Sequence, residues 1–63
     1  MNKYSTPVHT FSDHEYSAIV CEEPAGFSAT FTTPDGVVRK EYYLFEEVAV
    51  YSARRWVVLS QAQ

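Results

Sequence analysis

The sequence predicts an α+β domain, in which a three-stranded antiparallel β-meander is covered on one face by a single C-terminal helix. Three observations predict this fold. Residues 27–32 alternate apolar and hydroxyl-bearing side chains, the period of a half-buried strand. Turn-forming residues occur at 23–26 and 33–36. From residue 44 onward the apolar residues follow a helical period. A chain of 63 residues provides for one such domain.

The segment before the predicted sheet is polar and has no hydrophobic period. We therefore expect residues 1–12 to form a loosely held arm, followed by a folded core over 13–60. Residues 12–15, Ser-Asp-His-Glu, match the capping box that begins many helices. The next seven residues are β-prone, which favours a turn at 12–15 and a first strand at about 16–22, with a helix start at 12–15 as the alternative.

The second and third predicted strands span about 27–33 and 37–43. A Thr-Pro-Asp-Gly turn joins them. Closing this turn as a four-residue loop pairs Phe31 with Val38, so that apolar residues share one face. A shift by one residue would set charged residues opposite apolar ones, so the pattern favours this register.

The loop at 23–26 joins the first two strands, and the same reasoning pairs Val20 with Ala29 and Ala18 with Phe31. Both hairpins then place their apolar residues on the same face, which needs a cover. The predicted buried face consists of Tyr16, Ala18, Val20, Phe27, Ala29, Phe31, Val38 and Tyr42.

The predicted helix spans about 44–57 and supplies that cover. Its first turn is acidic at 46–47 and its last turn is basic at 54–55, the order that the helix dipole favours. Whether 57–60 continues the helix or forms a short strand is left open. The stripe predicted to be buried is Leu44, Phe45, Val48, Ala49, Ser52, Trp56 and Leu59. The side predicted to face away is Glu46, Glu47, Val50, Ala53, Arg54 and Val57.

Composition argues against several classes of protein. A lone Cys21 cannot form an internal disulfide, and no apolar run resembles a secretory signal or a membrane span, so we expect a cytoplasmic protein. Side chains able to bind metal concentrate only at His9, Asp13, His14, Glu15 and Cys21, and their spacing fits no familiar zinc site. So small a domain seldom forms a pocket that excludes water. We expect no enzyme, metal or cofactor.

The charge distribution indicates the kind of partner. The net charge is −3, and five of the eight acidic residues lie in residues 1–35, so we expect a protein partner with a basic surface. The sheet face away from the helix carries Ile19, Val37 and Tyr43, and it needs a partner, a second copy joined through that face or a sheet edge, or the arm 1–12 to cover it. The predicted partner-binding residues are Ile19, Glu22, Glu23, Asp35, Val37, Glu41, Tyr43, Glu46 and Glu47.

A nucleic-acid-binding surface is the alternative. Four basic residues, Arg39, Lys40, Arg54 and Arg55, lie near aromatic residues in the sequence, as in many nucleic-acid-binding proteins. The acidic net charge argues against this interpretation.

Five motifs follow one another along residues 16–56. They are the strand Tyr16–Val20, the Glu-Pro-Ala-Gly turn, the alternating strand Phe27–Phe31, the Pro-Asp-Gly loop and the helix start Glu46-Glu47-Val48. This order resembles the N-terminal domain of HicB-type antitoxins. The DNA-binding module of such antitoxins is lacking here and the Pro-Asp-Gly loop is tighter, so the resemblance implies a partner-neutralising protein without autoregulation. We therefore expect a small non-enzymatic inhibitor of a larger macromolecule, of the kind that phages and mobile elements encode.

Overall fold

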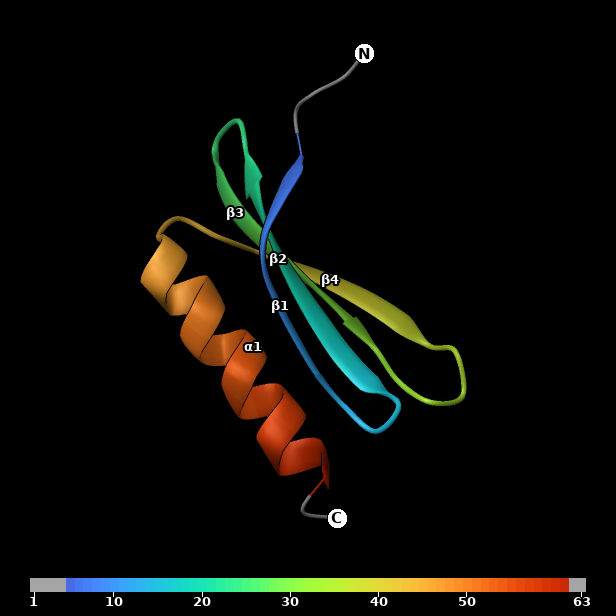
Figure 1. The fold of residues 1–63 in the computed structure, drawn as a ribbon. Helices are drawn as coiled ribbons and strands as arrows, with labels where there is room; N and C mark the ends of the chain where they lie inside the picture. The colour runs from blue at the N-terminus through green and yellow to red at the C-terminus, as the bar shows by residue number, and fades with distance from the viewer. Residues whose placement is uncertain (1–4, 62–63) are drawn as a thin grey trace.

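A computed structural model describes residues 5–61 as a four-stranded antiparallel sheet and one helix (Figure 1). The elements are β1 (Thr6–Asp13), β2 (Tyr16–Glu23), β3 (Gly26–Thr32), β4 (Val38–Tyr43) and α1 (Glu46–Gln61). The strands follow the sheet in sequence order, which leaves β1 and β4 at its edges. The helix lies across one face, mainly over β2. We call the opposite face the outer face. The α+β class and the single helix are confirmed, but the sheet has four strands instead of three.

The additional strand is β1, where a loose arm was predicted. Residues 1–4 of that arm lie outside the described residues. Phe11 pairs with Ala18 and packs against the core, and His9 pairs with a buried residue of β2. The pairing is irregular at Val8, which has no partner in the ladder, as at a β-bulge. Phe11 is the one large apolar side chain that the described part of β1 places on the helix side, so its alternation is too weak to predict a strand.

A two-residue turn, His14–Glu15, connects β1 to β2. His14 adopts a left-handed backbone conformation with φ of 57°, which histidine tolerates better than most residues. Its Nδ1 atom lies 2.7 Å from Oδ1 of Asp13. The predicted turn at 12–15 is therefore shorter than expected, and no helix begins there.

The pairing of β2 with β3 is the predicted one, with Val20 opposite Ala29 and Ala18 opposite Phe31. The predicted register of β3 with β4 is wrong by one residue, because Phe31 lies opposite Arg39. All apolar side chains of β4 were assigned to the wrong face as a result.

Thr33 sets the register of β4 because it closes a turn of five residues instead of four. Its backbone N–H donates to the Val37 carbonyl at 3.0 Å, and the Gly36 N–H donates to the Thr33 carbonyl at 3.0 Å. The Thr33 hydroxyl also donates to Asp35 at 2.6 Å and accepts from the Val37 N–H at 3.1 Å. Val38 and Tyr42, predicted to be buried, therefore lie exposed on the outer face, and Tyr43 packs against the core.

Small residues dominate the contact between the sheet and α1. Trp56 closes one end of this contact. The centre of its ring lies 4.9 Å from the centre of the Phe31 ring and 5.7 Å from the centre of the Tyr16 ring. The buried core is formed by Ala18, Val20, Ala29, Phe31, Ala49, Ala53 and Val57.

The helix is rotated relative to the orientation predicted from its sequence. Ala53 and Val57, predicted to face away, are buried, and Val50 packs against the core. Val48 and Leu59 of the predicted buried stripe are exposed on α1 instead. Leu44 and Phe45 are also exposed, because they precede the helix, which spans Glu46–Gln61 and not the predicted 44–57. Alanine lets α1 approach the sheet closely, which larger side chains at those positions would prevent. Residues 57–60 are helical, which answers the question left open by the sequence.

Enlarging Ala53 tests this orientation. Ala53→Leu is expected to destabilise the fold by about 1–3 kcal/mol, because no space exists for the added carbons in the packed contact. Arg54→Leu, at the exposed neighbouring position of α1, is the control and is expected to change the free energy of unfolding by less than about 0.5 kcal/mol. Urea unfolding measures both variants. Equal effects would contradict the observed rotation.

Candidate functional site

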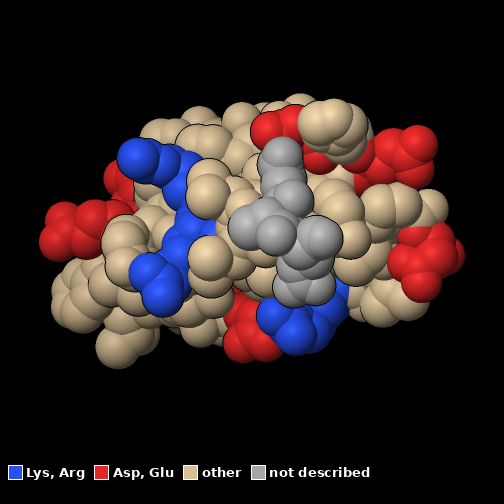
Figure 2. All heavy atoms as spheres, turned by 90° about the horizontal axis from the view of Figure 1, so that it is seen from below, with Lys and Arg blue, Asp and Glu red and all other residues tan. Residues whose placement is uncertain are grey.

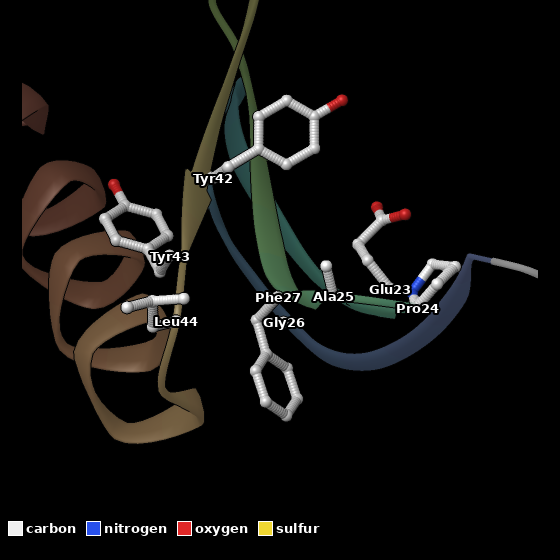
Figure 3. A pocket seen from close by; sticks show the side chains of 8 residues that line it. All are labelled: Glu23, Pro24, Ala25, Gly26, Phe27, Tyr42, Tyr43 and Leu44. Atoms are coloured by element: carbon white, nitrogen blue, oxygen red, sulfur yellow. The ribbon is translucent and has the colours of Figure 1, made fainter.

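An open groove of about 480 Å³ lies where β2 turns into β3 and where β4 leaves the sheet (Figure 3). We call it the end groove. Tyr42 and Tyr43 point to opposite sides of β4, and Tyr43 lies toward α1. Tyr42 and Leu44 are 68% and 74% exposed. The groove is lined by Glu23, Pro24, Ala25, Gly26, Phe27, Tyr42, Tyr43 and Leu44. Mostly apolar walls with few polar groups are typical of sites that bind another molecule.

Acidic residues gather around this end of the molecule. Glu22 and Glu23 end β2, and Glu46 and Glu47 begin α1 directly after the groove residue Leu44. These four carboxylates form what we call the acidic rim.

The contacts of His9 tie the start of α1 to the sheet beside the acidic rim. Nε2 of His9 lies 2.8 Å from Oε2 of Glu46. His9 is paired with Val20, and Glu22 lies two residues further along β2 on the same face. Glu46 and Glu22 therefore lie on the same side of the sheet, toward the same end of the molecule.

Glu23 forms the polar wall of the end groove and is held by several partners. Its Oε2 atom accepts hydrogen bonds from the hydroxyls of Ser28 at 2.6 Å and Ser5 at 3.1 Å, and it lies 3.6 Å from Nζ of Lys40. The Ser28 hydrogen bond is the main cause that lowers the pKa of Glu23, and Ser5 and Lys40 contribute. Ser28 is fully buried, so this carboxylate also satisfies a hydroxyl that has lost contact with water.

Lys40 and Tyr42 complete the outer wall. The Lys40 ammonium lies 5.3 Å from the centre of the Tyr42 ring, a cation–π geometry. The contact with Tyr42 is the largest cause that raises the pKa of Lys40, and Glu23 adds to the shift. Lys40 offsets the charge of Glu23, and His9 engages Glu46, so the carboxylates of Glu22 and Glu47 are the more available for a partner.

The structure brings together five of the nine residues predicted to bind a partner. Glu22, Glu23, Glu46 and Glu47 form the acidic rim, and Tyr43 lines the groove. Tyr43 was predicted on the outer face, but it lies on the helix side and is partly buried.

The other four predicted residues lie elsewhere. Asp35 and Val37 belong to the β3–β4 turn, at the opposite end of β4 from the groove. Ile19 lies midway along the outer face, paired with Thr30. Glu41 lies 3.4 Å from Arg39 on the helix side of β4. They do not form one surface with the acidic rim.

Two groove residues, Tyr42 and Leu44, were predicted to be buried. Tyr42 was misplaced because a four-residue turn was predicted before β4, and Leu44 was misplaced because the helix was predicted to begin at residue 44, whereas α1 begins at Glu46. Thr33 carried the signal for the first error, since a hydroxyl at this position bonds to the backbone of the turn.

The basic residues are dispersed. Arg39 lies on the helix side, 5.4 Å from the Phe31 ring centre, whereas Lys40 lies on the outer face. Arg54 and Arg55 belong to α1. On the face shown in Figure 2, Lys and Arg side chains fall into two groups with Asp or Glu beside each. A nucleic-acid backbone needs a continuous basic surface, and this face does not provide one.

Within residues 5–61, no group of three or more His, Cys, Asp or Glu side chains is arranged to hold a metal ion. Cys21 is a free thiol, half-buried on the outer face. The one helix of the described chain is too short and too polar to cross a membrane.

The close approach of Gly26 to β4 predicts a strong effect of a single methyl group. Gly26 has φ of 154°, and a Cβ there would lie 2.5 Å from the Tyr43 carbonyl oxygen. Gly26→Ala is expected to cost about 1–3 kcal/mol in backbone strain and about 1–3 kcal/mol in overpacking. Gly36 also has a positive φ, of 89°, but open space around it, so Gly36→Ala is expected to cost only about 1–2 kcal/mol. Chemical unfolding compares the two, and equal losses would contradict the close approach.

The hydrogen bonds of Glu23 predict a pH dependence of stability. A carboxyl whose pKa is lowered by folding stabilises the fold above its unfolded pKa, about 4.3, and loses this effect as the pH falls toward the folded pKa. Wild type is therefore expected to exceed Glu23→Gln in stability at neutral pH, with a gap that narrows in acid below pH ~4. Urea unfolding across this range measures the gap, with Glu22→Gln at the exposed neighbouring carboxylate as the control. A stability difference between wild type and Glu23→Gln that stays constant in acid would contradict the lowered pKa of Glu23.

Comparisons with protein-family models, with curated proteins and with solved structures find no match for this chain. The end groove and the acidic rim are therefore the basis for the function proposed below.

Proposed function

We propose that this protein is a non-enzymatic binder that neutralises a larger macromolecular partner by seating a basic, partly apolar segment of that partner in the end groove. The observation that carries the proposal is an exposed apolar wall with a rim of carboxylates at the same end of the molecule. Tyr42 and Leu44 expose most of their side chains in the groove, and the acidic rim lies beside them.

The chemistry of this juxtaposition fits arginine and lysine side chains. Such side chains have apolar stems, which pack on the apolar wall of the groove, and charged ends, which reach the carboxylates of the acidic rim. Complementary charge also speeds the encounter of two proteins and disfavours acidic competitors. An exposed aromatic residue surrounded by polar groups is a common centre of binding energy.

The protein would neutralise its partner by covering a basic site on the partner's surface. A rim of carboxylates imitates the charge of a nucleic-acid backbone and so competes for a basic site on the partner. This mechanism agrees with the resemblance to HicB-type antitoxins and with an inhibitor of phage or mobile-element type acting in the cytoplasm.

Charge reversal at the two ends of the molecule tests the proposal. Glu22→Lys/Glu46→Lys removes the charge beside the groove, whereas Glu15→Lys/Asp35→Lys makes the same change of net charge in the turns at the opposite end. The tagged proteins are used to capture partners from host cells, and the affinity of the captured protein is measured by calorimetry. The groove pair is expected to weaken binding at least tenfold, about 1.4 kcal/mol or more, and the turn pair by much less.

Two results would contradict the proposal. Equal losses from both pairs would mean that net charge alone determines binding. Tight binding of short DNA or RNA duplexes at low salt, falling steeply as salt rises, would instead support the alternative with Arg39, Lys40, Arg54 and Arg55 as contacts. Circular dichroism of each variant checks that the fold is retained.

A further inference from the structure

The helix has a second apolar side, which faces solvent. Val48, Tyr51, Arg55 and Val58 succeed one another at intervals of three and four residues, the spacing of a helix–helix seam, and Leu59 borders them. Tyr51, Val58 and Leu59 are 62%, 65% and 51% exposed. We call these five residues the helix stripe.

Large apolar side chains are concentrated on this side of the molecule. Among the described residues, six of the ten exposed large hydrophobic side chains belong to α1 or to the two residues that lead into it. The opposite side of α1 already packs on the sheet through Ala49, Ala53 and Val57. A helix in an isolated domain normally turns its large apolar residues inward, so the reverse arrangement indicates that the helix stripe is covered by another molecule.

We propose that the helix stripe binds a second copy of this chain, with the two α1 helices antiparallel and the two-fold axis near Tyr51. Charge complementarity supports a second copy of the chain as the molecule that covers the helix stripe. Glu47 and Arg55 each lie four residues from Tyr51, so an antiparallel pair sets Glu47 of one copy level with Arg55 of the other, twice. A parallel pair of α1 helices would instead set Glu47 beside Glu47 and Arg55 beside Arg55.

The position of Arg55 is compatible with this contact. Its Nη1 atom donates a hydrogen bond to the Tyr51 hydroxyl at 3.1 Å, and its guanidinium lies 5.9 Å from the Tyr51 ring centre. The side chain therefore lies along the stripe, where the second copy would contribute a carboxylate to it. Two Tyr51 rings near the axis would provide further cation–π partners for the two guanidiniums.

The size of the molecule makes such a contact valuable. A standard interface removes about 800 Å² from each partner, roughly a fifth of the 4382 Å² surface of this protein. Domains of about 60 residues bury only about 60% of their unfolded surface, so the added burial would increase stability substantially. A helix of 16 residues is about 24 Å long, so a contact along α1 alone gives an interface toward the small end of the usual range.

Sedimentation equilibrium of the purified full chain, from micromolar to millimolar concentration, tests the proposal. The wild type is expected to associate to a dimer. Val58→Lys, in the helix stripe, is expected to weaken association at least tenfold, whereas Val38→Lys, an equally exposed position on the outer face, is expected to leave it unchanged. A wild type that stays monomeric at millimolar concentration, or a dimer lost in Val38→Lys and kept in Val58→Lys, overturns the proposal.

Charge exchange tests the antiparallel arrangement. Glu47→Arg and Arg55→Glu are each expected to weaken the dimer severalfold, and the double variant is expected to restore it to within about twofold of the wild type. A double variant no better than the single ones overturns the pairing. Circular dichroism confirms that α1 is present in each variant. Glu22→Lys/Glu46→Lys is expected to dimerise normally, so failure of the dimer and failure of the groove are distinguished.

Discussion

The close contact of alanines between α1 and the sheet determines which side chains of the helix are buried and which are exposed. Ala49 and Ala53 meet Ala18 and Ala29, and all four side chains are completely buried. Four methyl groups let the helix axis approach the strands closely, and Trp56 fills the space at one end of the contact. Because the small side of α1 must face inward, its large side chains must face outward. The surface chemistry of the helix thus follows from the size of the residues in the core.

A second constraint acts through the turn at Thr33. Its hydroxyl and backbone groups hold a five-residue loop, which moves every residue of β4 to the face opposite the one expected for a four-residue loop. Tyr43 then packs inward, and Tyr42 stands on the outer face beside Lys40 and Glu23. The end groove exists because this turn and the close approach of Gly26 to β4 coincide.

The sequence was a good guide wherever one hydrophobic pattern had a single interpretation. The β2–β3 register followed from alternation, because a shift by one residue would have set the polar residues Ser28 and Thr30 on the face of Ala18 and Val20 in place of Ala29 and Phe31. The pattern of β4 misled because Arg39 and Glu41 stay exposed on this edge strand although they lie opposite Phe31 and Ala29, so the observed register buries no charge. The choice of register depended on hydrogen bonds inside the turn. The rotation of α1 misled because the helix is apolar on two sides, and large residues outweigh alanines in any hydrophobic pattern. All four residues of the acidic rim were among the predicted partner-binding residues. Their position beside a groove depends on three-dimensional contacts that the spacing of residues in the sequence does not encode.

The two edges of the sheet have a consequence for how the protein can assemble. The ladder of β1 is interrupted at Val8 next to Pro7, and β4 carries consecutive charges at Arg39, Lys40 and Glu41. Such edges resist the addition of further strands, which would otherwise propagate into fibrils. The proposed contact between two helix stripes uses the same patch on both copies and leaves that patch unavailable to a third copy. The irregular edges thus favour a closed, finite particle over an open polymer.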